Sequence, residues 1–346
     1  MGDWLDWLKA DPRPWLLETS SAPVRAQTLR SLYGRSDSDP DVRAAVALAM
    51  CQEPIASILA AQADEGYWDK PGPGYGPKYR GSVWTLIFLG QLGADPGDPR
   101  ISRACEYVLA HAQAVSGGFG MSANAELRAP PPSTVLHCLN GNLLRALITF
   151  GWLDDERVQR AIDWQARAIT GEGFDGYFRS GTSGPGFCCA ANQRQPCAWG
   201  AVKALLGLSA VPEGRRSESV ERAIETGAAF LLGRDPAIAD YPIPSYATKP
   251  NGSWFKLGFP LAYVTDMLQN LEVLCELDYG GDERLANARA KVLSKQDGEG
   301  RWKNEYAYNG KTVVDIERQG APSKWVTLRA CKVLSRMSPD HTGPSE

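Results

Sequence analysis

The chain has 346 residues, a formal net charge of −3 and eight cysteines. The small negative charge argues against nucleic acid as the main partner, and we find no apolar segment of membrane-spanning length and no N-terminal signal pattern. Eight cysteines in a chain of this length do not indicate a small disulfide scaffold, so we expect mostly reduced thiols in a cytoplasmic protein.

Along the chain, helices with one polar face alternate with helices that are apolar on nearly every side. Residues 3–17 are rich in tryptophan and predict an outer helix broken by Pro12 and Pro14. Later outer helices start at residues that cap helices well, namely Asp39, Asp98, Asp154, Ser217 and Asp282. Between them we predict buried helices at residues 24–33, 81–92, 133–150, 196–208, 257–277 and 323–334.

This pairing of a surface helix with a buried helix recurs about every 50–60 residues, and repeats of that length are typical of solenoids or closed arrays. Six pairs without convincing polar end caps predict an all-α (α/α)6 toroid, in which a ring of inner helices lies inside a ring of outer helices. We assign residues 1–337 to this single domain and expect residues 338–346 to form a disordered tail.

The connections differ in length. Those from an inner helix to the next outer helix are short, whereas those leading back to an inner helix are long. Long loops in compact domains are usually functional. We therefore predict that the deepest pocket opens at the rim where the inner helices begin.

Two of the long loops begin with the same spacing. Gln62 and Gln296 are each followed by three residues, a glycine, one further residue and a tryptophan, Trp68 or Trp302. Weaker versions occur at 113–119 and 165–174. This spacing resembles the Gln-Trp repeat of squalene–hopene cyclases. Together with the helix pairing, nearly the whole chain resembles the α/α-toroid superfamily of terpene cyclases and protein prenyltransferase β-subunits.

The resemblance implies a structural role for these strings, with glutamine capping a helix end and tryptophan stacking on it. It also implies a small hydrophobic or isoprenoid-like substrate in the central cavity of an isomerase or lyase. Two departures are clear: the chain lacks the Asp-Xaa-Asp-Asp acid motif of class II terpene cyclases and the Asp-Xaa-Cys zinc string of prenyltransferases. The closest acidic string, at Asp37 and Asp39, is better interpreted as a helix cap.

A first group of candidate site residues is rich in sulfur. Cys188 and Cys189 lie in a long loop, Cys197 begins one inner helix, and Cys138, next to His137, begins the preceding one. Thiolates and imidazole suit tetrahedral zinc. The alternative is a set of small packing cysteines, which is our interpretation of the other four, Cys51, Cys105, Cys275 and Cys331.

A second candidate is Asp266, which the helical spacing places on one face with Phe259 and Tyr263. A carboxyl group in an apolar cavity has a raised pKa and can donate a proton, so Asp266 and Tyr263 are candidate catalytic residues. The alternative is that Asp266 pairs with a neighbouring Arg145 or Lys203.

The last long loop supplies a third group. Asp315 and Glu317 suit a general acid or a cation site, with solvated loop charges as the alternative, and Lys324 suits an anion site. Aromatic residues near the inner helices line a hydrophobic chamber or belong to the core; they are Trp84, Phe88, Trp199, Trp254, Phe255, Phe259, Tyr263 and Trp325.

These observations favour a terpene-cyclase-like enzyme. Three alternatives remain open: a zinc enzyme built on the cysteine group, an (α/α)6 carbohydrate-active enzyme with paired acids, and a non-catalytic toroidal binding protein.

Overall fold

The computed structural model describes residues 3–121, 129–173 and 183–339. Within these residues the regular structure is helical apart from strands β1 (Trp302–Lys303) and β2 (Pro322–Ser323), which pair antiparallel. The all-α prediction is therefore confirmed. None of the described helices is both long and apolar enough to cross a membrane.

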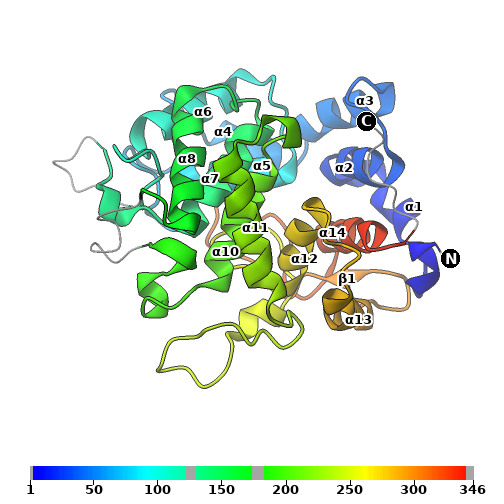
Figure 1. Ribbon diagram of the computed structural model, residues 1–346. Helices are drawn as coiled ribbons and strands as arrows, with labels where there is room; N and C mark the ends of the chain where they lie inside the picture. Colours follow the sequence, from blue (N-terminus) through cyan, green and yellow to red (C-terminus); the bar gives the residue numbers. More distant parts are fainter. Residues whose placement is uncertain (1–2, 122–128, 174–182, 340–346) are drawn as a thin grey trace.

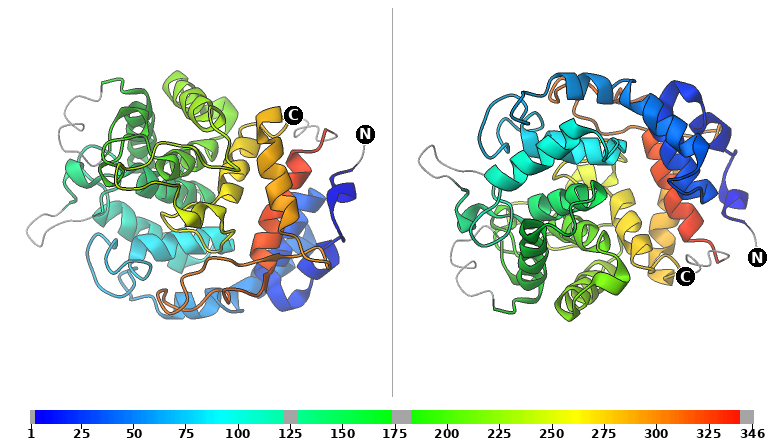
Figure 2. Two further views of the ribbon diagram at one scale, coloured as in Figure 1. Left: turned by 90° about the horizontal axis from the view of Figure 1, so that it is seen from below. Right: turned by 90° about the horizontal axis from the view of Figure 1, so that it is seen from above.

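The inner helices form a closed ring. In chain order they are α2 (Ala22–Tyr33), α5 (Ser82–Leu92), α7 (His137–Thr149), α10 (Ala198–Ser209), α12 (Met267–Glu276) and α14 (Lys324–Arg336). Figure 2 shows the chain running once around the molecule, so that the last inner helix returns beside the first, and α14 contacts α2. The predicted toroid is therefore closed by contact between its first and last repeats.

The outer helices pack around this ring (Figure 1). They are α3 (Pro40–Met50), α4 (Ile55–Ala60), α6 (Pro99–His111), α8 (Glu156–Thr170), α11 (Glu218–Leu232) and α13 (Ala286–Ser294), with η1 (Trp4–Trp7) and α1 (Arg13–Leu16) near the N-terminus. The connecting 3-10 turns are η2 (Thr19–Ser21), η3 (Pro132–Thr134), η4 (Pro185–Phe187), η5 (Ala190–Asn192), η6 (Glu213–Arg215), η7 (Gly252–Phe255) and η8 (Glu283–Leu285).

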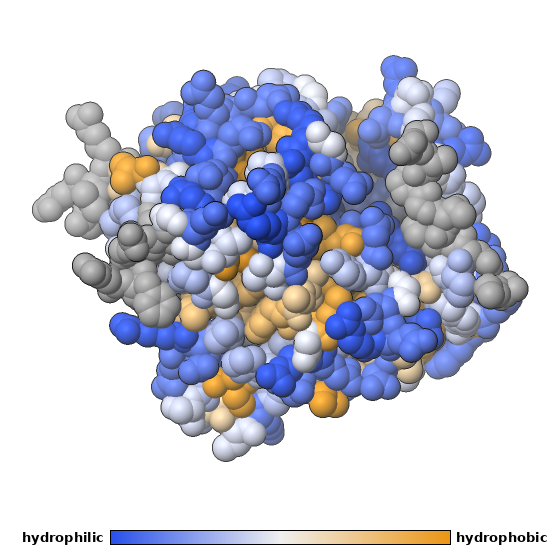
Figure 3. Space-filling view, viewed as in Figure 1, coloured by the Kyte–Doolittle hydropathy of each residue, from blue (hydrophilic) through white to orange (hydrophobic). Residues whose placement is uncertain are grey.

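The two rings differ in burial as their sequences predict. In α5 every residue is buried except Gly90 and Gln91, whereas α8 buries one face only. The face of the molecule in Figure 3 is accordingly mostly hydrophilic, with apolar residues gathered near its middle. Most outer-helix caps are as predicted, but α8 is capped by Asp155, whose side chain accepts from the Arg157 amide, and not by Asp154.

The fifth inner helix is shorter than predicted. The helical pattern favoured residues 257–277, but α12 starts at Met267, and residues 257–266 form an irregular segment. Proline disfavours helical conformation in the residue before it, so Pro260 interrupts the pattern. Asp266 then caps the helix by accepting from the Gln269 amide at 2.7 Å. The prediction that Phe259, Tyr263 and Asp266 share a helical face is therefore wrong.

Neighbouring inner helices approach most closely at glycines. A Cβ atom on Gly141 of α7 would lie 2.0 Å from the carbonyl oxygen of Lys203 in α10, and one on Gly207 would lie 2.7 Å from the oxygen of Gly141. Any larger side chain would separate these helices. The small residues of α10 thus allow backbone-to-backbone contact inside the ring.

The Gln-Gly-Trp strings link one repeat to the next. The Gln62 side chain donates to the carbonyl of Arg100 in the following outer helix, and the Trp68 indole donates to Ile58 in its own helix. The glycine between them, Gly66, has a positive φ, and a Cβ there would lie 2.6 Å from the Arg103 carbonyl oxygen. The structural interpretation of the strings is confirmed by these contacts.

We expect Trp302→Ala to lower the free energy of unfolding by about 3–5 kcal/mol, because a fully buried indole is replaced by a methyl group. Trp302 is 0 % exposed and donates to the Val292 carbonyl at 2.7 Å. Denaturant unfolding measures the loss, and Trp152→Ala, at a partly exposed tryptophan, serves as the control. Equal losses in both variants would contradict the structural role.

Candidate functional site

The inner helices and the outer helix α3 line an open cavity of about 1060 Å³, the central cavity, to which every inner helix contributes residues. Its apolar wall includes Ile87, Ala146, Leu206, Phe259, Leu261, Trp325 and Leu328. Its charged lining comprises Arg30, Asp37, Arg43, Asp95, Arg145, Glu272, Glu276, Arg329 and Lys332. The cavity therefore combines an apolar wall with many charged groups of both signs.

The cavity lies at the rim opposite to the predicted one. Its lining includes Thr149 and Glu276 at the ends of α7 and α12, and Asp37 and Asp95 in short connections. At the other rim the long loops fold inward and fill the space. Tyr308 from the loop after β1 is 3 % exposed and packs on Tyr79, with ring centroids 4.3 Å apart. The rim prediction is wrong because loop length does not reveal whether a loop fills a ring or surrounds an opening.

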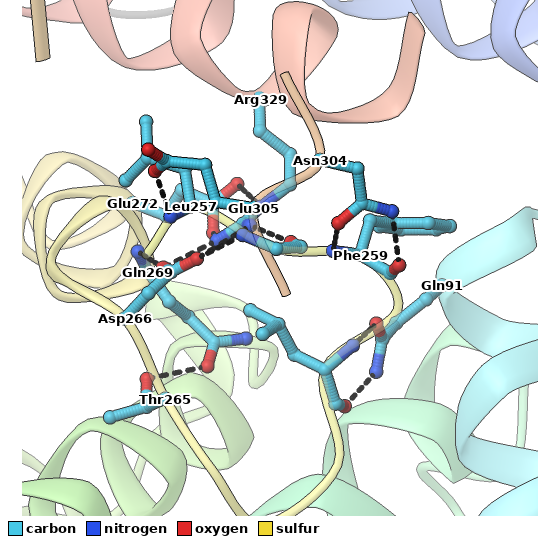
Figure 4. A network of polar contacts seen from close by, with 12 residues as sticks. Gln91, Leu257, Phe259, Thr265, Asp266, Gln269, Glu272, Asn304, Glu305 and Arg329 are labelled. Atoms are coloured by element: carbon cyan, nitrogen blue, oxygen red, sulfur yellow. Dashed lines mark hydrogen bonds and ion pairs between the residues drawn. The ribbon is translucent and has the colours of Figure 1, made fainter. Parts of the chain in front are cut away.

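An ion cluster forms the floor of the central cavity (Figure 4). Arg329 of α14 donates to both oxygens of Glu272 at 2.9 and 2.8 Å and to both oxygens of Asp266 at 3.1 and 3.2 Å. Its remaining N–H donates to the Gly258 carbonyl at 2.6 Å. All five guanidinium donors are thus used, which fixes the orientation of this side chain.

The two carboxylates outweigh the effect of burial on Arg329. Burial alone would lower the pKa of the guanidinium, but Asp266 and Glu272 raise it above its usual range. Glu276 is paired in the same way with Arg145, at 2.8 Å. Burial would raise the pKa of Glu276, but the charge of Arg145 holds it below its ordinary value. Pairing with Arg145 therefore favours the ionised form of Glu276.

Asp266 has the geometry of an acceptor and not of a proton donor. Besides Arg329, it accepts from the amides of Gln269 and Gly258 at 2.7 and 2.9 Å. Each carboxylate oxygen thus receives two N–H groups. The alternative prediction was that Asp266 pairs with a neighbouring basic residue. Asp266 does so, but its partner is Arg329 and not Arg145 or Lys203.

The predicted aromatic residues divide into three places. Phe259 and Trp325 line the cavity with stacked rings, whose centroids lie 4.5 Å apart. Trp254 and Phe255 lie in the region of η7, where the Trp254 indole donates to Pro236 and Lys291 lies over the Phe255 ring.

The other aromatic residues gather where the inner helices begin. We call this group the aromatic cluster; it comprises Tyr75, Tyr79, Trp84, Phe88, Trp199, Tyr263, Tyr306 and Tyr308. Tyr263 is therefore part of a packed aromatic group and does not line the cavity.

The two acidic residues of the last long loop, Asp315 and Glu317, have different environments. Asp315 is exposed and accepts from the Gly310 amide within its own loop. Glu317 is largely buried and accepts from the Ser323 hydroxyl and from Asn304. Burial raises the pKa of Glu317 to about 7. Lys324, the predicted anion ligand, is instead paired with Glu18 at 2.8 Å.

In the part of the chain that the structure describes, the sulfur group is not brought together as a set of three or more ligands. No group of three or more His, Cys, Asp or Glu side chains there is arranged to hold a metal. His137 is buried and bonded at both nitrogens, to Gln165 and to the Gly184 carbonyl, and burial lowers its pKa to about 4. An imidazole with both nitrogens occupied is not available as a ligand.

Two of the four cysteines nevertheless lie together. The Cys197 thiol hydrogen-bonds to Cys189, and this bond lowers the pKa of Cys189 to about 6. Cys138 is buried, which raises its pKa to about 12, and it is close enough to Cys189 to interact with its charge. Burial also raises the pKa of Cys188. The sulfur group is thus a thiol pair with two further thiols nearby.

The charged residues that line the cavity are not among the site residues predicted from the sequence. Arg329 and Lys332 are three residues apart on α14, and Glu272 and Glu276 are four apart on α12. These spacings put each pair on one helical face. Two residues of like charge on one face of an otherwise apolar helix are a sequence signal from which this charged lining could have been predicted.

The sequence predicts Lys203 of α10 only as an alternative partner for Asp266. It is 0 % exposed, and its ammonium nitrogen has no hydrogen-bond partner among the described residues. Burial lowers its pKa to about 7. Lys203 is therefore a second buried basic group close to the ion cluster.

We expect Arg329→Met to cost about 3–5 kcal/mol of folding free energy, because it leaves Asp266 buried without its counter-charge. Arg80→Met removes an exposed pair with Asp69 and should cost less than about 1 kcal/mol. Thermal and denaturant unfolding measure both. A small loss in the Arg329 variant would show that the cluster does not stabilise the ring.

We expect Glu317 to make stability depend on pH. Its pKa is about 7 in the folded protein against an ordinary value of 4.5, so its contribution is fully present below the ordinary value and is lost as the pH rises through about 7. Glu317→Gln should flatten this part of the profile, whereas Asp315→Asn should leave it unchanged. Identical unfolding profiles for the three proteins would contradict the burial of Glu317.

Comparison with known proteins gives matches among solved structures only: no protein-family model matches, and no curated protein sequence does. The chain is similar to the type II terpene cyclase MstE from Scytonema. A variant of MstE in complex with the substrate geranylgeranyl dihydroxybenzoate is 15 % identical, with 85 % of this chain and 97 % of that chain covered and a TM-score of 0.33. The apo enzyme is 17 % identical, with 84 % and 97 % covered and a TM-score of 0.32.

Proposed function

We propose that this protein is a terpene-cyclase-like enzyme that binds an isoprenoid-like molecule in the central cavity and acts on it as an isomerase or lyase. The observation that carries the proposal is the cavity itself. Its volume of about 1060 Å³ is just above the range of roughly 300–1,000 Å³ for small-molecule sites. The apolar wall suits a long hydrocarbon chain, and the Gln-Gly-Trp strings support the choice of enzyme class.

The charged groups suit a polar head on the same molecule. Lys332 lines the cavity, and no ion pair or hydrogen bond of its ammonium occurs among the described residues. Burial lowers its pKa, against the influence of Glu276 and Glu272. We assign to Lys332 the binding of an anionic or strongly polar head group, while Phe259 and Trp325 contact the hydrocarbon chain. Aromatic faces also stabilise positive charge that develops on such a chain.

Within this proposal Asp266 is a positioning residue. It holds the Arg329 guanidinium in the floor of the cavity, together with Glu272. Asp266→Asn is then expected to weaken binding of the polar head through Arg329. It is not expected to remove a proton donor.

The carbohydrate alternative is less well supported by the same geometry. Glycoside hydrolysis needs one carboxyl group that is protonated and one that is ionised. Two of the cavity acids, Glu272 and Glu276, are paired with arginines. Neither has the environment of a general acid.

The test is binding followed by product analysis. We expect linear twenty-carbon prenyl compounds to quench the fluorescence of Trp325, and compounds with a carboxylate or diphosphate head to bind more tightly than the alcohol. Oligosaccharides should not bind. Mass spectrometry of the extracted compounds then distinguishes an isomer of unchanged mass from a product that has lost its head group. Oligosaccharide binding with turnover would overturn the proposal, and so would the absence of prenyl binding.

We expect Leu206→Trp combined with Leu328→Trp to weaken prenyl binding at least about tenfold, or roughly 1.4 kcal/mol. Both side chains line the cavity, so larger groups there occupy the space of the ligand. Val115→Trp, at a residue that is 82 % exposed, is the control and should bind as the parent does. Circular dichroism confirms that the variants are folded. Unchanged affinity in the double variant would place the ligand outside the cavity.

A further inference from the structure

The cysteine pair before α10 is held together by the backbone around it. Residues 183–197 form a tight loop in which Cys188 and Pro196 make an antiparallel bridge. The Cys189 amide donates to the Gln195 carbonyl at 3.3 Å, and the Cys197 amide donates to the Phe187 carbonyl at 3.0 Å. Both cysteines therefore lie on neighbouring, paired segments.

The turn between the two segments is fixed by Asn192. This buried side chain donates to the carbonyls of Pro196 and Pro242 at 2.8 and 3.1 Å. A loop constrained in this way keeps its two ends close at little further entropic cost. The paired segments place Cys189 and Cys197 on the same side, as diagonal neighbours, and each thiol shifts the pKa of the other.

The neighbouring cysteines are less suited to pairing. Cys188 and Cys189 are consecutive residues of the bridged segment, so their side chains point to opposite sides of it. Cys138 lies across in α7, outside the bridged segments. Cys189 and Cys197 are both partly exposed, so small solutes can reach them.

We propose that Cys189 and Cys197 form an oxidisable dithiol, a modification site that hydroperoxides convert to a disulfide. The Cys189 thiolate attacks one oxygen of hydrogen peroxide, which breaks the O–O bond, releases hydroxide and leaves a sulfenic acid. The Cys197 sulfur then attacks the Cys189 sulfur. The S–S bond forms, the S–O bond breaks, and the leaving hydroxyl takes the Cys197 proton to give water. The sulfurs are oxidised and the peroxide is reduced.

The disulfide has a consequence for α10. Cys197 is the N-cap of this helix, and its sulfur accepts from the Gly200 amide at 3.5 Å. A bond to Cys189 ties the loop to the first turn of an inner helix, next to Trp199 of the aromatic cluster. Oxidation should therefore alter the fluorescence of Trp199, and a thiol reductant should reverse the change.

The experiment treats the intact protein with hydrogen peroxide and maps its thiols by mass spectrometry. We expect a loss of about 2 Da and one bond, between Cys189 and Cys197, that dithiothreitol reverses. Cys51→Ser, at an exposed cysteine elsewhere, should form the same bond. In Cys197→Ser the sulfenic acid of Cys189 should persist and be trapped by dimedone.

Other outcomes would overturn the proposal. One is a bond between a different pair of cysteines, and another is overoxidation of Cys189 in the parent protein without a disulfide. Cys197→Ala provides a second test in case the serine variant does not fold, and it should show the same trapped sulfenic acid. A bond that still forms in either Cys197 variant would assign the second thiol to Cys138 or Cys188.

Discussion

The Arg329 cluster is the interaction on which the interior of the ring depends. A single guanidinium joins α14, α12 and the irregular segment before α12 through five hydrogen bonds. Each partner is buried or partly buried, so none can exchange its bond for water without moving a helix. The cluster also closes the floor of the central cavity, which makes one set of contacts responsible for both ring geometry and site geometry.

The cavity and the aromatic cluster occupy opposite ends of the same ring. At the start of the inner helices, Tyr75, Tyr79 and Tyr263 pack on Trp84, Tyr308 packs on Tyr79, and together these rings close the interior. At the other end, the short connections are too short to fold inward, and the interior stays open. Asp37, Arg43 and Asp95 line the cavity at this end. In the proposed function, the ligand enters past these residues with its hydrocarbon chain reaching inward.

The repeat is held in register by side chains that cross from one outer helix to the next. Gln62 donates to Arg100 and Gln113 donates to Arg157, each at the first turn of the following outer helix. These bonds join the first turn of one outer helix to the end of the preceding one. They explain why the glutamine recurs with fixed spacing even where the aromatic residue of the string changes from tryptophan to phenylalanine.

The amino-acid sequence by itself determined the class of fold. Apolar residues on every side of 81–92 and 196–208 require burial, and alternation with amphipathic helices leaves a double ring as the arrangement that buries them all. It also determined the structural role of Trp68 and Trp302, because their spacing from a glutamine and a glycine is local. Such features depend on residues near one another in the chain.

The tertiary structure alone decided the site. Asp266 meets Arg329, which is 63 residues away in sequence, and no local pattern reveals that both oxygens are occupied. The side of the ring that stays open depended on how loops from separate repeats pack together. The fate of the sulfur group depended on which thiols the backbone brings together: Cys189 and Cys197 meet, whereas His137 is held by Gln165. The periodicity of apolar residues shows which face of a helix is buried. The groups that this face contacts are set by the packing of distant repeats.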